Sequence, residues 1–328
     1  MSFTQRLATS TPIRKLSTAL AKKNVTVVSK DKLRKMTAEY KTIDKVVVSK
    51  EQAEGVGAKV RRSIGTWELR NLDPFLMLDE FMVGKPAGFP DHPHRGFETV
   101  TYMLDGTFQH EDFAGHKGTI GPGDLQWMTA GKGIVHAEMP LGDKVATGLQ
   151  LWVNLPKSAK MVPPRYQELL DKDVPRAQTE DGGVVVKVIA GDSLGVSAKV
   201  HTYTPIYYLD VKMEKGQVFE QDIPADYTGF VYTLSGTAHF GSNTVKPEPH
   251  STLVMSKTGN TLKIETKDSK AHFVIIAGQP LKEPIVQHGP FVMNEQKEIH
   301  QAIMDYQMGQ NGFENAARWE SEIAARRR

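Results

Sequence analysis

Two short histidine-containing pairs are the residues of this chain best suited to chemistry. His92 and His94 flank a proline, and 42 residues after His94 the pair His136 and Glu138 flanks an alanine. Within each pair the spacing is i, i+2, so both side chains point to the same face of a β-strand. If the two strands are neighbours, three imidazoles and one carboxylate converge. The sequence therefore predicts a metal site with coordination positions left for water or substrate.

The types of ligand restrict the metal. The chain has no cysteine, so disulfides and thiolate sites are excluded and any metal is held by nitrogen and oxygen. Three imidazoles and a carboxylate favour Fe(II) or Mn(II), while nickel, copper and zinc stay open. Spacing alone also leaves open a second interpretation, in which the histidines are structural and hydrogen-bonded within the core.

Length and composition describe a soluble globular protein. The 328 residues suggest two domains, and no apolar run approaches the roughly 20 residues that span a bilayer. Residues 1–62 carry 15 Lys and Arg against 5 Asp and Glu, which leaves the remainder with a net charge of −7. Because the residues after 62 are acidic overall, we do not expect nucleic-acid binding through a broad basic face.

The N-terminal segment has a composition of its own. Residues 1–30 are basic, rich in serine and threonine, and free of aspartate and glutamate. This composition is typical of a transit peptide, and it fits a disordered basic tail equally well. We therefore expect residues 1–41 to form a disordered extension, with mitochondrial import as an open alternative.

Short strand-like runs alternate with glycine and proline turns through the middle of the chain. Phe97–Leu104 leads into the turn Asp105-Gly106, and the turn 121–124 precedes Leu125–Met128. Strands at this spacing predict an all-β sandwich or barrel.

One of these runs recurs. The run that starts at Tyr102 and ends in Asp-Gly-Thr resembles the run that starts at Tyr232, at an offset of 130 residues, which predicts a duplicated barrel. The offset maps His92 and His94 onto Asp222 and Pro224. Because proline cannot bind a metal, we expect the second barrel to be metal-free.

The C-terminal residues change to a helical period. Asn294 predicts the N-cap of a helix that ends at Asn311-Gly312. A second short helix is expected around Trp319, ending in Arg326–Arg328.

Long motifs in the chain resemble the pirin family of bicupin proteins. They include "GFPDHPHRGFETV", "PGDLQWMTAGKGIVHAEMP", "GLQLWVNLP" and "QHGPFVMN". The resemblance runs from about Val46 to about Trp319. It implies an all-β fold of two tandem cupin (jelly-roll) barrels with short C-terminal helices. The implied domains are an extension over 1–41, a metal-binding cupin over 42–170, a metal-free cupin over 171–290, and helices over 291–328 that pack back on the barrels.

The resemblance also implies the contents of the site. It places one Fe(2+) in the N-terminal cupin, with four ligands: His92, His94, His136 and Glu138. Glu98 occupies the glutamate position of the general cupin motif, and we expect it beside the ligands, paired with Arg95.

Two functions follow from the resemblance. The first is quercetin 2,3-dioxygenase activity, the O2-dependent cleavage of a flavonol ring. Glu138 would be the catalytic base for the 3-hydroxyl, and Arg95 would steady the anion at the mouth of the site. The alternative is an iron-dependent, redox-sensing transcriptional coregulator that binds transcription factors without catalysis. The family points to the nucleus and cytoplasm. From composition we expect neither membrane insertion nor direct nucleic-acid binding, and we expect a monomer.

Other residues near the motifs are assigned more ordinary roles. Trp127 and Met128 are expected to pack in the core. Four polar residues after Asp105-Gly106 favour a solvated loop over a cavity wall. They are His110, Glu111, Asp112 and His116.

Overall fold

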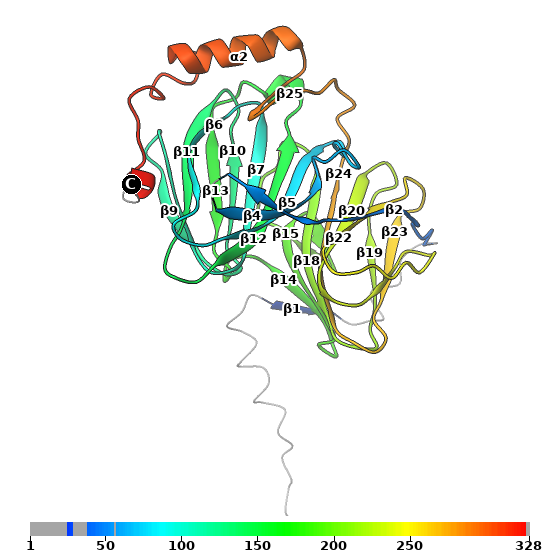
Figure 1. Cartoon of the computed structure of the whole chain (residues 1–328). Helices are drawn as coiled ribbons and strands as arrows, with labels where there is room; N and C mark the ends of the chain where they lie inside the picture. The colour runs from blue at the N-terminus through cyan, green and yellow to red at the C-terminus, as the bar shows by residue number, and fades with distance from the viewer. Residues whose placement is uncertain (1–24, 29–37, 56, 326–328) are drawn as a thin grey trace, which may run out of the picture.

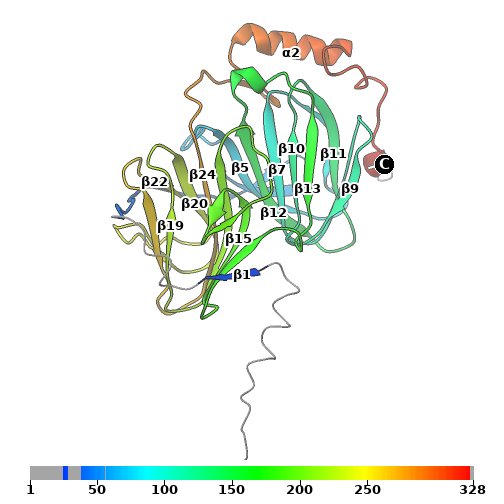
Figure 2. The same ribbon diagram turned by 180° about the vertical axis from the view of Figure 1, so that it is seen from behind.

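The structure is a computed structural model, and it describes residues 25–28, 38–55 and 57–325. Two β-barrels lie side by side, with the first at the left and the second at the right of Figure 1. A C-terminal helix, α2 (Gln296–Met308), lies across the end of the first barrel (Figures 1 and 2). The predicted all-β fold of two tandem cupin barrels is confirmed.

The first barrel is built from a seven-stranded and a four-stranded sheet. The larger sheet has the order β13-β10-β7-β12-β5-β4-β3 and the smaller one β6-β11-β8-β9. The strands are β3 (Glu51–Glu54), β4 (Ala58–Ile64), β5 (Phe75–Val83), β6 (Phe89–His94), β7 (Phe97–Asp105), β8 (Phe108–Asp112), β9 (Lys117–Ile120), β10 (Leu125–Thr129), β11 (Ile134–Pro140), β12 (Ala146–Asn154) and β13 (Arg165–Leu169). A short 3₁₀ helix, η2 (Lys157–Ala159), precedes β13.

The second barrel repeats this plan with an eight-stranded sheet and a three-stranded sheet. Their orders are β1-β14-β15-β18-β24-β20-β22-β2 and β19-β23-β21. The strands are β1 (Val25–Val28), β2 (Ile43–Val48), β14 (Arg176–Thr179), β15 (Val184–Ala190), β18 (Ile206–Met213), β19 (Val218–Asp222), β20 (Thr228–Gly236), β21 (His239–Phe240), β22 (Ser251–Met255), β23 (Thr261–Glu265) and β24 (Ala271–Gly278). Two small hairpins are added, β16 (Asp192–Ser193) with β17 (Val196–Ser197) and β25 (Val286–His288) with β26 (Phe291–Met293).

The N-terminal strands differ from the sequence prediction. We expected residues 1–41 to be disordered, yet β1 pairs in parallel with β14. The prediction for residues 1–24 and 29–37 concerns residues outside the described part of the chain. We also placed residue 42 onward in the first barrel, whereas β2 pairs with β22 of the second. The chain thus supplies both edge strands, β1 and β2, of the large sheet of the second barrel before it enters the first.

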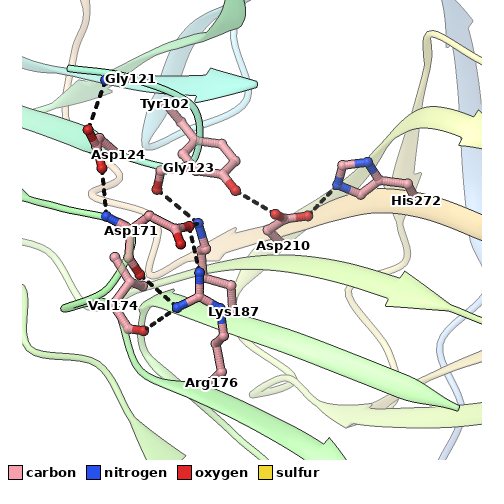
Figure 3. Close-up of polar contacts among 10 residues, drawn as sticks. All are labelled: Tyr102, Gly121, Gly123, Asp124, Asp171, Val174, Arg176, Lys187, Asp210 and His272. Carbon is pink, nitrogen blue, oxygen red and sulfur yellow. Dashed lines mark hydrogen bonds and ion pairs between the residues drawn. The ribbon is translucent and has the colours of Figure 1, made fainter. Parts of the chain in front are cut away.

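The two large sheets pack against each other and form a core between the barrels. Val100 and Trp127 of the first barrel share this core with Tyr208 and Phe230 of the second. Figure 3 shows a polar contact across the same seam, where the Tyr102 hydroxyl donates to Asp210 Oδ2 over 2.5 Å. The central strands of the first barrel are therefore covered on both faces.

The C-terminal helices differ from the prediction in their bounds. The N-cap of α2 is Glu295, not Asn294, because the Glu295 and Glu298 side chains form a capping box with each other's backbone. The helix ends at Gly309, which has a left-handed φ of 63°. The second helix, α3, is only Glu322–Ala325. Within the described residues, neither helix is long and apolar enough to cross a membrane.

Candidate metal centre

The two predicted pairs lie on adjacent antiparallel strands of the small sheet, β6 and β11. His136 is the register partner of His92, and a bulge follows between His136 and Glu138. Because side chains alternate between the two faces of a strand, Val135 points to the face opposite His136, where it packs against the C-terminal helix α2. The register therefore sets both pairs facing the inside of the first barrel.

Three histidines meet there. One ring nitrogen from each of His92, His94 and His136 lies within 4.8 Å of the others. The ring centroids are 4.3 Å apart for His92 and His136 and 5.0 Å apart for His94 and His136. His94 is 2% and His136 1% exposed. Three imidazoles at this separation, two of them buried and His92 partly buried, have the size of a metal site.

The chemistry of these nitrogens fits a cation. Among the described residues, neither ring nitrogen of His94 or of His136 has a hydrogen-bond partner. Burial, together with the neighbouring His92, holds the pKa of each ring well below its usual value, so both rings are neutral at pH 7. His92 places Nδ1 2.8 Å from the Pro90 carbonyl oxygen, and donation there leaves Nε2 free. Buried, neutral and unpartnered nitrogens are what a metal ion would satisfy.

Glu138 faces the same cavity but does not join the histidine cluster. It is 4% exposed, and its Oε1 accepts a hydrogen bond of 2.9 Å from the Thr101 hydroxyl. The structure thus brings together three of the four predicted ligands and places the fourth nearby. Its role as ligand and base stays a prediction.

A cavity of about 1100 Å³ opens beside the histidines. Its apolar wall includes Met77, Phe89, Phe108 and Trp152, and His92 and His94 line it as well. Its polar wall lies on the large sheet and contains Arg62, Asp79, Thr101 and Gln150. The volume and the mixture of aromatic and polar side chains suit a small planar molecule.

Arg95 does not lie where we expected it. Because it is one residue beyond His94, the strand alternation sends it to the outer face, where it is 1% exposed. Its guanidinium forms an ion pair of 2.7 Å with Asp305 of α2 and donates to the Lys132 and Asn311 carbonyl oxygens. The predicted pairing with Glu98 and the predicted contact with a substrate anion are both wrong.

Glu98 is not beside the predicted metal ligands either. It is the register partner of Thr129 on β10 and lies on the face of β7 that Val100 and Tyr102 turn to the second barrel. Its Oε1 accepts a hydrogen bond of 2.7 Å from the Thr129 hydroxyl. The prediction that it supports the ligands is therefore wrong.

The burial of Glu98 predicts a measurable pH dependence. Burial raises the pKa of Glu98 from 4.5 to about 7, against the effect of the Thr129 hydrogen bond. A raised pKa means that its contribution to stability is present below pH 4.5 and is lost as the pH rises through 7. The neutral substitution Glu98→Gln should remove this loss, so above pH 8 the variant should be about 3 kcal/mol more stable than wild type, and near pH 4.5 equally stable.

Denaturant unfolding of both proteins at several pH values, with a chelator present, checks this expectation. A difference in unfolding free energy that does not change with pH would contradict it. Because Glu98 lies on the far face of β7, the substitution should leave metal binding unchanged.

The polar residues after the turn 105–106 form a buried strand and not a solvated loop. His110, Glu111 and Asp112 belong to β8, which pairs with β9 and β11 on its two sides, and each is at most 5% exposed. His110 is the register partner of Glu138 and lies 2.6 Å from Glu168. His116 follows the strand, and its Nδ1 lies 2.8 Å from Asp112.

One further expectation from the sequence is confirmed, and two residues that line the cavity were not predicted. Trp127 and Met128 are fully buried, as predicted. Thr101 and Gln150 line the cavity and were missed. Nothing in their types marks them as functional, and only the pairing of β7 with β12 sets them beside each other.

Comparisons with known proteins agree with this site and fold. A family model described as Pirin matches residues 57–153, and one described as the Pirin C-terminal cupin domain matches residues 208–312. Pirin from Mus musculus is 57% identical over 87% of this chain and 99% of its own length. Pirin from Homo sapiens is 56% identical over 84% of this chain and 96% of its own length. A pirin-like protein from Solanum lycopersicum is also 56% identical, over 85% and 95%.

Solved structures add to these similarities. A quercetin 2,3-dioxygenase from Acinetobacter baumannii has a TM-score of 0.77 and 33% identity, covering 84% of this chain and 99% of its own. A bacterial pirin from Escherichia coli in complex with nickel(II) has a TM-score of 0.58 and 21% identity, covering 72% and 100%, which is a likeness of fold. With family matches to both barrels and identities above 50% over nearly the whole length of curated relatives, the chain belongs to the pirin family of cupin proteins.

Proposed function

We propose that this protein is an iron-dependent dioxygenase of the quercetin 2,3-dioxygenase type. The proposal rests on the cluster of three imidazoles at the wall of a cavity of about 1100 Å³, in which the buried rings of His94 and His136 have no hydrogen-bond partner among the described residues. The 33% identity to a quercetin 2,3-dioxygenase supports this substrate class. The occupant we propose is a small aromatic molecule such as a flavonol.

The donor set fits a divalent iron. His92, His94 and His136 would hold it through neutral ring nitrogens, and the carboxylate of Glu138 would complete the set. An iron ion bound there would supply the Lewis acidity and redox chemistry for the addition of O2 to the flavonol, with carbon monoxide and a depside as products.

The chain's own residues would bind and deprotonate the substrate. Phe89, Phe108 and Trp152 offer apolar surface to the flavonol rings and exclude water around the reacting atoms. Glu138, within the same cavity, takes the proton of the 3-hydroxyl and so generates the flavonolate. A carboxylate that binds a metal tightly is a weak base, so Glu138 would act as the base through an oxygen that is not tightly bound to the ion.

Turnover of quercetin tests this proposal. Protein loaded with Fe(II) under anaerobic conditions and then given quercetin and air should lose the flavonol absorbance and release carbon monoxide. The substitution Glu138→Gln keeps the three histidines and should leave a folded protein that binds Fe(II) more weakly and, when loaded with an excess of Fe(II), has lost turnover. Glu98→Gln is the matched control, because the same chemical change on the far face of β7 should leave turnover intact.

Two results would contradict the proposal. One is the absence of turnover with Fe, Mn, Cu and Ni in turn, and the other is full turnover by Glu138→Gln. The coregulator role that the family resemblance implies stays a prediction. It requires binding to a transcription factor that changes with the oxidation state of the iron.

A further inference from the structure

A hydrogen-bonded chain of two side chains leads away from Glu138 along the cavity wall. The Thr101 hydroxyl oxygen lies 2.9 Å from Glu138 Oε1 and 2.7 Å from the Gln150 side-chain oxygen. Thr101 and Gln150 are register partners on β7 and β12, so their side chains leave the same face of the sheet. Thr101 is 1% exposed, whereas Gln150 is only partly buried and lines the cavity.

The number of hydrogens in this chain decides its direction. A threonine hydroxyl has one hydrogen to donate and can accept from others. A carboxylate that binds a cation is ionised and only accepts, so the Thr101 hydrogen must point to Glu138. Gln150 can then complete the chain by turning its amide, which places its NH2 group as a donor to the Thr101 oxygen. Turning the amide exchanges its oxygen and nitrogen without moving the rest of the Gln150 side chain, because the two atoms have nearly the same size.

The consequence concerns the two oxygens of Glu138. The Thr101 hydroxyl donates to Oε1, and this is the hydrogen bond that the structure gives the Glu138 carboxylate within the described residues. A carboxylate fixed through one oxygen presents the other in a defined direction, and outer partners of this kind set the orientation and basicity of a metal ligand.

We propose that Thr101 and Gln150 are positioning residues that orient the Glu138 carboxylate for binding the metal through Oε2. This inference rests on the proposed function, because it requires Glu138 to be a ligand. The position of Thr101 supports a role at the site, since its neighbours Val100 and Tyr102 point to the second barrel and Thr101 alone of the three faces the cavity.

Binding of Co(II), without any turnover, tests the inference. Cobalt prefers the same nitrogen and oxygen ligands, and its visible absorption reports the number of bound ligands. Thr101→Val keeps the shape of the side chain and removes the hydroxyl. It should raise the dissociation constant for Co(II) by about 10- to 100-fold and change the absorption bands. Thr101→Ser keeps the hydroxyl and should bind Co(II) with the wild-type spectrum.

A second variant, Gln150→Leu, tests the inference even if Thr101→Val does not fold. Gln150→Leu removes the amide from a partly exposed position, so the protein should fold, and its affinity for Co(II) should fall less than that of Thr101→Val. Thermal unfolding of each variant separates the two roles, because a merely structural residue lowers the melting temperature and leaves the affinity unchanged.

The outcomes distinguish this inference from the proposed function. If wild type and Thr101→Val bind Co(II) with equal affinity and the same spectrum, Thr101 does not position Glu138, and the proposed function stands. Should Thr101→Val fail to fold, wild-type affinity in Gln150→Leu would overturn the inference. If the wild-type protein bound neither cobalt nor iron, both this inference and the proposed function would be contradicted.

Discussion

Replacing His94 by alanine should abolish metal binding and flavonol turnover in a protein that still folds. His94 is 2% exposed and contributes one of three converging nitrogens, and no other ring lies in place to substitute for it within the described residues. Loss of an outer partner of a ligand already costs about 10- to 100-fold in affinity, so the loss of a ligand should exceed that range.

Elemental analysis and turnover of the purified variant check this expectation. The control is His116→Ala, because the His116 side chain is 53% exposed and contacts Asp112 outside the cluster. His94→Gln provides a second variant that fills most of the volume of the ring. Full metal content in both His94 variants would show that the ion binds elsewhere.

Replacing Asp305 by alanine should destabilise the protein strongly. Arg95 and Asp305 form an ion pair of 2.7 Å in which both side chains are 2% exposed. Removal of the carboxylate leaves a buried guanidinium without its charge partner, which typically costs about 3–5 kcal/mol. The pair joins β6, which carries His92 and His94, to α2, so the loss should also loosen the helix from the first barrel.

Denaturant unfolding of Asp305→Ala and of a control on the same helix measures this cost. Gln301 is exposed and donates one hydrogen bond of 2.8 Å to Asp305, so Gln301→Ala should cost about 1 kcal/mol or less. Equal unfolding free energies for the two variants would contradict the importance of the buried pair.

The convergence of the three histidines could be predicted from the sequence, because the spacing of residues on a strand determines which side chains share a face. Side chains at i and i+2 share a face on any strand, so His92 and His94 must point together, as must His136 and Glu138. A slip of one residue between the strands would turn one pair outward. The register that pairs His136 with His92 brings the three histidines together, while their role and that of Glu138 as metal ligands stay predictions.

The surroundings of the site could not be predicted in this way. The strand from Phe97 to Asp105 is buried on both faces because one face lines the first barrel and the other packs on the second. Its residue pattern therefore did not indicate which barrel Glu98 faces. The partner of Arg95 is 210 residues away in sequence. Contacts at such a separation depend on how whole elements pack, and no local pattern encodes them.

The strand that contains His110 was missed for a related reason. Its sequence is polar, which is typical of a loop, yet β8 is buried because neighbouring strands pair with it on both sides. Thr101 and Gln150 are similar cases, since only the pairing of β7 with β12 brings them beside Glu138.

The central claim is that one divalent ion binds to three imidazoles and one carboxylate in the first barrel. Anomalous X-ray diffraction at the iron edge, from crystals of the iron-loaded protein, tests it most directly. We predict one anomalous peak per chain, at bonding distance from ring nitrogens of His92, His94 and His136 and from an oxygen of Glu138. A peak elsewhere in the molecule, or none in protein that has been offered iron, would contradict the account.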